Sequence, residues 1–193
     1  MNDWKDYEIR GLLHQEIQER FANQVETRII DEMGILEGSF RIDVAVINGK
    51  LHVYEIKSPR DTLSRLSKQA EAYSAIFNTM TLVTSPSYVI DAASIVPEWW
   101  GISIAINTVG GFILDQARQP KSNPHVDSRA VIELLWRAEM LEILEKEGLS
   151  KGVRNKSRDL LATRLVENLS SDEIQKTVRK TLKSRANWRP DLD

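Results

Sequence analysis

Two acids and one amine lie close together in an otherwise apolar part of the sequence. Asp43 stands twelve residues before Glu55, and Lys57 follows two positions later. Burying a charge costs on the order of several kcal/mol unless the group is paired or binds a metal ion. Two carboxylates beside an amine can meet that cost by holding a divalent cation. Mg²⁺ is the expected ion, with Mn²⁺ as a substitute, because a hard cation prefers oxygen ligands.

The segment that carries these residues has the pattern of a β-hairpin. It runs from Phe40 to Lys57 and reads FRIDVAVINGKLHVYEIK. Two runs rich in Val, Ile and Tyr, Arg41–Ile47 and Leu51–Ile56, flank the turn signal Asn48-Gly49. Such runs suit a pleated surface, and Asn-Gly is the strongest short hairpin signal. The pattern predicts two adjacent antiparallel strands.

The length of the turn decides whether the two acids can share a cation. A two-residue turn would place Ile47 opposite Lys50 and send Asp43 and Glu55 to opposite faces of the sheet. A shared cation therefore needs a three-residue loop, a bulge or a sharp twist at Asp43. Lys57 shares a face with Glu55 in any case, because side chains alternate with a period of two.

A helix is predicted after the hairpin, with Asp61 or Thr62 as its cap. Its apolar stripe has helical spacing and consists of Leu63, Leu66, Ala70, Tyr73 and Phe77. Gln69 and Tyr73 are four residues apart and lie on one face of this helix. Gln69 borders the stripe, so it can lie at the edge of a site, whereas Tyr73 belongs to the stripe and is also expected to pack in the core.

These residues together resemble the PD-(D/E)XK nuclease superfamily. Asp43 and Glu55-Ile56-Lys57 match its metal-site motif, and Gln69 to Tyr73 (QAEAY) matches the QxxxY helix motif of its RecB-like branch. The longer stretch RIDVAVINGKLHVYEIKSPRDTLSRLSKQAEAY is similar to a group of small bacterial proteins in that superfamily. The resemblance covers roughly residues 30–105. Ile42 stands where the motif has a proline.

The resemblance implies an α/β fold, a restriction-endonuclease-like mixed sheet flanked by helices. It implies a divalent-metal-dependent nuclease that hydrolyses phosphodiester bonds, with DNA as the expected nucleic acid. Asp43, Glu55 and the carbonyl of Ile56 would hold the metal. Lys57 would orient the attacking water or offset charge in the transition state. Gln69 would position water or a phosphate, and Tyr73 is a candidate contact to nucleic acid.

A further acid is expected, because the first helix of this superfamily often adds one to the metal site. Asn2–Phe21 has the apolar spacing of a helix, and Glu8 is the candidate on it. A solvated glutamate on a helix explains Glu8 better than a metal ligand does. Glu32 is the alternative, because it lies just ahead of the hairpin in the predicted strand Val25–Met33.

Strands are also predicted at Met80–Thr84, Gly101–Ile106 and Phe112–Leu114, with a short helix at Tyr88–Ile95. Trp99 and Trp100 are expected to pack in the core, with base stacking as the alternative. The order of helix, hairpin, helix and strand agrees with a mixed α/β core.

The composition narrows the class of protein. The chain has 193 residues, no cysteine and a net charge of −2. Disulfides, thiolate metal sites and cysteine nucleophiles are therefore excluded. No run approaches the roughly 18 apolar residues that span a membrane, and the first residues lack the apolar core of a signal peptide. A cytoplasmic protein is expected.

The last part of the chain differs in charge from the rest. The proline-containing segment Arg118–Val126 suggests a boundary between a nuclease-like core, residues 1–120, and a helical region, residues 121–193. Three helices are predicted there, beginning after Asp127, Ser157 and Ser170. From residue 151 onward there are 11 Lys and Arg against 6 Asp and Glu, whereas the preceding residues hold 15 against 22. The last helix is predicted to contact nucleic-acid phosphates through Lys176, Arg179, Lys180 and Lys183.

Two other functions are compatible with the sequence. One is a DNA-binding module on the same fold whose chemistry is weak or lost, and the other is a protein-interaction role for the helical region. The complete set of Asp43, Glu55 and Lys57 favours the nuclease, because an inactive site tends to lose one of its members. Chelation by EDTA distinguishes these functions, because only the nuclease requires metal.

Overall fold

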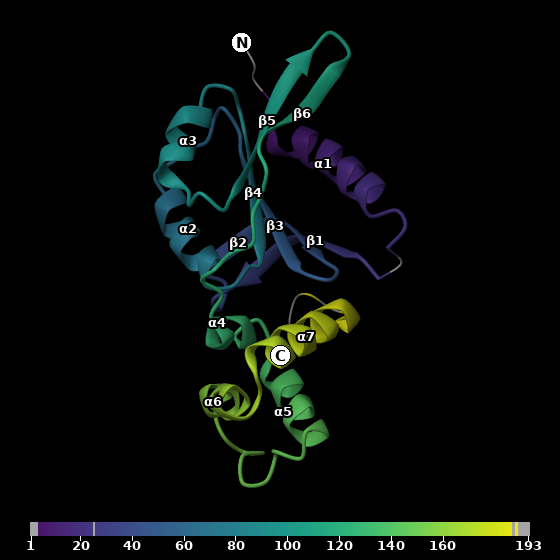
Figure 1. The fold of residues 1–193 in the computed structure, drawn as a ribbon, viewed down its shortest axis with the longest axis vertical. Helices are drawn as coiled ribbons and strands as arrows, with labels where there is room; N and C mark the ends of the chain where they lie inside the picture. The colour runs from purple at the N-terminus through teal and green to yellow at the C-terminus, as the bar shows by residue number, and fades with distance from the viewer. Residues whose placement is uncertain (1–3, 25, 187, 189–193) are drawn as a thin grey trace.

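The structure is a computed structural model that describes residues 4–24, 26–186 and 188 (Figure 1). Within these residues one mixed sheet is accompanied by helices, which confirms the expected α/β class. The strands are β1 (Arg28–Ile35), β2 (Phe40–Ile47), β3 (Leu51–Lys57), β4 (Thr79–Thr84), β5 (Gly101–Thr108) and β6 (Gly111–Arg118). The helices are α1 (Asp6–Arg20), α2 (Leu66–Ser74), α3 (Val89–Ile95), α4 (Ser128–Ile132), α5 (Arg137–Lys146), α6 (Arg158–Asn168) and α7 (Ser171–Ser184).

The six described strands lie side by side in the order of the chain. β1, β2 and β3 form an antiparallel meander, β4 and β5 continue it with parallel pairing, and β6 closes the sheet antiparallel to β5. The parallel step from β3 to β4 is made through α2, and the step from β4 to β5 through α3. A parallel step needs such a crossover, whereas β2 and β3 need only a short loop.

Each face of the sheet is covered by helices from a different part of the chain. Figure 1 shows α1 on one side of the sheet and α2 and α3 on the other. The face toward α1 buries Val44, Val46, Tyr54 and Ile56 together with Ile9, Leu13 and Ile17 of that helix. The opposite face buries Ala45, Ile47, Leu51 and Val53. This alternation along β2 and β3 is the one that the period of two predicts.

The helical region lies at one end of the sheet (Figure 1). Its buried side chains belong to the same apolar cluster as the α2 face of the sheet, with members such as Leu144, Leu161 and Val178. The predicted boundary near residue 120 coincides with the end of β6, but the core continues across it. None of the helices in the described part of the chain has the length and apolar character that crossing a bilayer requires.

The region predicted as one long helix after the linker is two helices, α4 and α5. The backbone between them is held by two arginines from later in the chain. Arg158 donates to the Glu133 carbonyl at 2.6 Å and to the Leu135 carbonyl at 3.3 Å. Arg185 donates to the Leu134 carbonyl at 2.9 Å. The last carbonyls of a helix have no partner within it, and the two arginines give each of these three carbonyls a hydrogen bond at the break.

Several predicted caps are confirmed and one is wrong. Asp127 accepts a hydrogen bond from the backbone of α4, and Ser170 and Glu173 form the predicted capping box of α7. α2 begins at Leu66, later than a cap at residue 61 or 62 would place it. Asp61 accepts instead from the backbone nitrogen of Ser58 at 2.7 Å, and so holds the turn after β3.

Candidate active site

The loop between β2 and β3 decides where the two predicted acids lie. Ile47 pairs with Leu51, so the loop contains three residues. Continuing that register along the hairpin places Asp43 opposite Glu55 on the same face. The three-residue loop is one of the alternatives that the sequence left open.

The sheet is also distorted beside Asp43. The ladder between β1 and β2 is interrupted at Glu32, whose φ of 56° lies in the left-handed region that residues with a side chain rarely adopt. Ile42 and Ala45 both join the apolar cluster on the α2 side, although an unbroken strand would send them to opposite faces. The strand therefore twists at Asp43, and the twist brings that carboxylate to the open end of the hairpin.

Asp43 is held by the neighbouring strand. Its Oδ2 accepts a hydrogen bond from the backbone nitrogen of Ile56 at 2.7 Å. Burial raises the pKa of the Asp43 carboxyl to about 7, and the nearby negative charge of Glu55 adds to this rise. The Ile56 hydrogen bond and the charge of Lys57 act in the opposite direction. Two neighbouring carboxyl groups in a cavity, one of which has a raised pKa, are typical of functional sites.

Glu55 is the centre of a small network of donors. Its side chain is 3% exposed, and Lys57 Nζ lies 2.6 Å from Oε1. The amide nitrogen of Gln69 donates to the same oxygen, and the Tyr73 hydroxyl donates to Oε2 at 3.2 Å. A buried carboxylate is unfavourable unless its oxygens accept hydrogen bonds. The three donors supply these bonds and fix the orientation of Glu55.

The side chains around this network line an open cavity of about 520 Å³. Asp43, Glu55, Lys57 and Gln69, all predicted as site residues, contribute to its wall. The cavity wall is mostly polar and charged, so it suits a polar, charged ligand rather than an apolar one.

The donors present fit a hard divalent cation. The two carboxylates and the Ile56 carbonyl offer oxygen atoms, which Mg²⁺ prefers. Gln69 Oε1 is buried and has no hydrogen-bond partner within the described residues, so a donor such as water is missing there. No group of three His, Cys, Asp or Glu residues with metal-binding geometry occurs in the described ranges. A cation held here would take its remaining ligands from water, because Mg²⁺ usually keeps several waters.

Helix α1 supplies a cation to this cavity. Nη2 of Arg10 lies 2.7 Å from Asp6 Oδ2, 2.6 Å from Glu32 Oε1 and 3.7 Å from Asp43 Oδ1. Nη1 also donates to the Asp43 backbone carbonyl at 3.3 Å. One guanidinium thus contacts three acids, and Arg41 Nε pairs with Glu32 Oε2 as well, at 2.6 Å.

The first-helix acid predicted from the sequence, Glu8, lies elsewhere. Its carboxylate is exposed and accepts a hydrogen bond from the Lys5 backbone nitrogen at 2.8 Å, at the start of α1. At about 100° per residue, Glu8 is about 200° around the helix from Asp6. Asp6 and the alternative candidate Glu32 line the cavity instead. Asp6 and Arg10 were missed, although their spacing of four residues was a signal that they share a face.

Tyr73 has a supporting position and no contact with solvent. It is 0% exposed, its ring stacks on Trp100 with centroids 6.3 Å apart, and its hydroxyl donates to the Arg41 carbonyl as well as to Glu55. A side chain buried in this way cannot touch nucleic acid, so that prediction is corrected. Trp99 and Trp100 are buried too, as core packing predicted.

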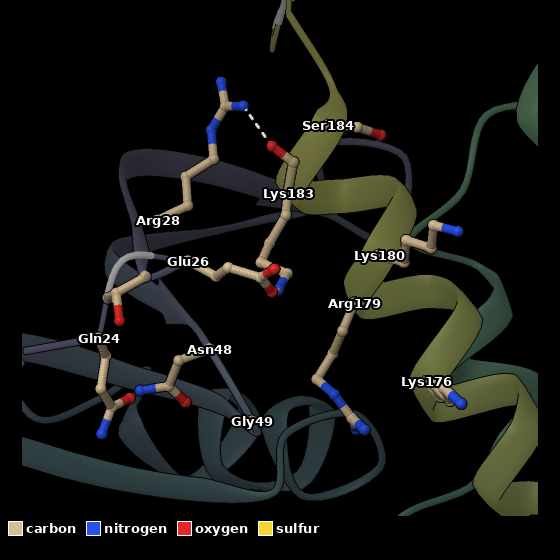
Figure 2. A pocket seen from close by; sticks show the side chains of 11 residues that line it. Gln24, Glu26, Arg28, Asn48, Gly49, Lys176, Arg179, Lys180, Lys183 and Ser184 are labelled. Carbon is tan, nitrogen blue, oxygen red and sulfur yellow. Dashed lines mark hydrogen bonds and ion pairs between the residues drawn. The ribbon is translucent and has the colours of Figure 1, made fainter.

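The cations predicted on the last helix lie at the other end of the hairpin. Figure 2 shows them beside a second cavity, of about 790 Å³, which α7 forms with the loop between β2 and β3. The cations of α7 in its wall are Lys176, Arg179, Lys180 and Lys183. They share one side of the helix as predicted, but they do not reach the cavity that holds Glu55.

Comparison with known proteins places the chain in a family. A protein-family model described as "Bacteriophage P4 protein cII" matches residues 2–190. Protein cII of Enterobacteria phage P4 is 25% identical over 160 residues, and the match covers 83% of this chain and 60% of the length of that relative. The solved structure of SPO1766, a protein of unknown function from Silicibacter pomeroyi, has a TM-score of 0.43 and 14% identity over 75% of this chain and 96% of its own. Because the family model spans nearly all of the sequence, the chain belongs to the family of bacteriophage P4 protein cII.

Proposed function

We propose that this protein is a Mg²⁺-dependent nuclease of PD-(D/E)XK type, which hydrolyses phosphodiester bonds in DNA. The observation that supports the proposal most is the meeting of Asp43, Glu55, Lys57 and Gln69 at one open cavity. These residues come from two strands and a helix, and nothing in core packing requires that their polar ends converge. The meander β1–β3 followed by the α2 crossover supports a restriction-endonuclease-like fold.

Each residue has a role that its contacts permit. Asp43, Glu55 and the Ile56 carbonyl would hold the cation, which when bound supplies charge neutralisation at the phosphate and a lower pKa for water. Lys57 reaches the cavity from the end of β3, so its ammonium can orient water and offset charge that develops on the phosphate. The unpartnered oxygen of Gln69 can accept a hydrogen bond from that water.

The proposal is tested by cleavage of supercoiled, linear and branched DNA in Mg²⁺, in Mn²⁺ and in EDTA. We expect metal-dependent cleavage that falls by about 10²–10⁴ in Lys57→Ala, the usual contribution of one acid–base group. Glu55→Ala and Asp43→Ala lose a metal ligand, so high Mg²⁺ should restore part of their activity, whereas Lys57→Ala should resist such rescue. Lys146→Ala, which removes an exposed lysine of α5, is the matched control.

Cleavage that survives undiminished in Asp43→Ala, Glu55→Ala and Lys57→Ala would belong to a contaminant and would end the proposal.

A DNA-binding module with weak or lost chemistry is the second candidate, because one observation favours it. Arg10 stands against Asp43 and can balance its charge without metal. Calorimetry decides between the two: binding of Mg²⁺ or Mn²⁺ that depends on Asp43 and Glu55 supports the nuclease. No such binding, together with metal-independent affinity for DNA, supports the module.

A further inference from the structure

The second cavity joins the helical region to the sheet. It lies between α7, the loop of the β2–β3 hairpin and the segment that leads into β1 (Figure 2). Gly49 in that loop and Glu55 are six residues apart along the hairpin, which corresponds to about 20 Å of extended chain. The cavity is therefore a separate place from the candidate active site, and a ligand bound in it does not depend on the proposed nuclease activity.

Two of the cations in its wall are used to hold the structure together. Lys183 Nζ lies 2.6 Å from Glu26 Oε2, and Arg28 donates to the Lys183 backbone carbonyl at 2.6 Å. These contacts fasten the last turn of α7 to the start of β1. Lys183 is paired with an acid and Arg28 with a carbonyl, so these contacts explain the position of α7 and not the purpose of the other cations.

Arg179 is different, because no acid in the described part of the chain forms an ion pair with it. Figure 2 shows its side chain extending from α7 toward Gly49 across the cavity. It is partly buried, and within the described residues it makes no hydrogen bond and no ion pair. Burial lowers the pKa of its guanidinium, with Asp172 acting weakly in the other direction. Removing a cation from water costs free energy unless an anion pairs with it, so we expect an anionic ligand beside Arg179.

The four cations of α7 form a line. Lys176, Arg179, Lys180 and Lys183 lie at positions i, i+3, i+4 and i+7 of one helix face, a row about 10 Å long, and Lys183 at its end is the one already paired with Glu26. A single phosphate or a mononucleotide would need donors that converge on one point, whereas a row suits a chain of negative charges. The cavity wall has no aromatic side chain among its described residues, so it offers no platform for a base.

We propose that the cavity between α7 and the hairpin loop binds the phosphodiester backbone of a nucleic-acid strand, with Arg179 as its central contact. Lys176 and Lys180 are exposed and flank Arg179 on the same helix face, so they meet the neighbouring phosphates. Binding here is expected to depend mainly on charge, because the cations of α7 would meet phosphates, which carry no base sequence.

The experiment measures binding of a fluorescein-labelled oligonucleotide, single-stranded and as a duplex, by anisotropy in EDTA, so that no cleavage intervenes. Arg179→Gln should weaken binding about 10- to 100-fold at low salt, because it removes a charged hydrogen-bond donor. The triple variant Lys176→Gln, Arg179→Gln and Lys180→Gln should flatten the slope of log K against log salt by about 0.9 for each lost duplex contact, and by about 0.7 for a single strand.

A matched control changes the net charge equally at a distance from the cavity. It carries Lys146→Gln, Lys151→Gln and Lys156→Gln, and it should retain both affinity and salt slope. Because binding is measured in EDTA, loss of affinity at the second cavity and loss of metal-dependent cleavage at the candidate active site can be observed independently. Because Arg179 has no partner among the described residues, Arg179→Gln should unfold at the same temperature as the wild type or a higher one.

Three results would overturn the proposal. One is unchanged affinity and slope in the triple variant, and another is an equal loss in the control triple. The third is competition by polyglutamate as strong as that by an oligonucleotide of equal charge, which would identify an acidic protein segment as the ligand.

Discussion

At the scale of single residues, the ionised form of Asp43 is less favourable in the folded protein than in water. The raised pKa of Asp43, about 7 against 3.8 in an unfolded chain, means that the folded protein binds a proton here that the unfolded chain has released. Between about pH 4 and pH 7 the folded state therefore binds more protons, and this group makes stability fall as pH rises. Removing that proton leaves a carboxylate that a cation can satisfy.

We therefore expect Asp43→Asn to change the pH dependence of stability in EDTA. The wild type should lose stability relative to Asp43→Asn as pH rises from about 4 to 7, with a difference in slope of at most about 1.4 kcal/mol per pH unit. Urea unfolding of both proteins across this range measures it. The comparison with the variant is necessary because His52 acts the other way: burial lowers the pKa of His52 to about 3, so its contribution rises with pH up to about 6.5.

Parallel stability curves for wild type and Asp43→Asn would show that Asp43 titrates normally in the folded chain. Addition of Mg²⁺ above pH 7 should stabilise the wild type more than the variant, because only the wild type has the carboxylate.

Arg10 lies where it would compete with a bound cation for acids of α1, β1 and β2. Its guanidinium lies against Asp6, Glu32 and Asp43, and its side chain is only 17% exposed. Arg10→Gln should raise the affinity for Mn²⁺ several-fold, because it leaves a more negative cavity, and should lower stability in EDTA by about 1–2 kcal/mol.

Calorimetric titration with Mn²⁺ and thermal unfolding in EDTA measure the two effects. Arg20→Gln is the control, since it makes the same charge change at the exposed end of the same helix. Metal affinity that is equal in Arg10→Gln and Arg20→Gln would mean that Arg10 does not compete.

At the scale of elements, the break between α4 and α5 shows how a distant side chain can end a helix. Arg185 is buried, contacts Glu139 Oε2 at 2.5 Å and the Leu134 carbonyl at 2.9 Å, and lies 4.2 Å from the ring centroid of Trp136. Its planar guanidinium contacts a carboxylate, a carbonyl and an aromatic ring at the same time, which the ammonium group of a lysine could not do.

Arg185→Ala should destabilise the chain by about 3–5 kcal/mol, because it leaves the Glu139 carboxylate without its main partner. Arg185→Lys should recover only part of that loss. Urea unfolding measures the size of the effect, and hydrogen exchange in α4 and α5 locates it. Arg154→Ala, at an exposed ion pair with Glu145, should cost no more than about 1 kcal/mol. Equal losses in the two alanine variants would contradict this account of the break.

At the scale of the whole molecule, the helical region and the sheet share one core. Val131, Leu144, Leu161 and Val178 belong to the same cluster as Ile47 and Leu51 of the hairpin. Large exposed apolar surfaces are rare on soluble monomers, so the sheet depends on the helices that cover its end. This core also holds α7 beside the hairpin loop, where the proposed backbone-binding cavity forms.

A chain truncated after residue 126 should therefore lose its cooperative unfolding or associate through the uncovered face. The measurement is urea unfolding together with sedimentation, and a truncation after residue 186, which keeps α7, is the control. A cooperative, monomeric fragment as stable as the full chain would show that the sheet folds alone and that the helical region is a true second domain.

Much of the fold and part of the site could be predicted from the sequence, because their causes are local. The hairpin follows from alternating apolar residues around Asn48-Gly49, and the capping box of α7 follows from two residues three positions apart. Strand alternation predicted that Glu55 and Lys57 share a face, and the resemblance of the following helix to the QxxxY motif added Gln69 to the same site.

The rest was decided by contacts between residues that are far apart in the chain. The twist at Asp43 accompanies the left-handed Glu32 on the neighbouring strand, and Arg10 joins Glu32 across the cavity. The end of α4 depends on Arg185, which lies 51 residues after the carbonyl that it binds. A sequence pattern records which neighbours are apolar, charged or turn-forming, but the partner of a buried charge is chosen only when the elements pack. For that reason the sequence by itself determined the hairpin and which of its side chains share a face, and the tertiary structure decided that Asp6, Arg10 and Glu32, and not Glu8, line the same cavity.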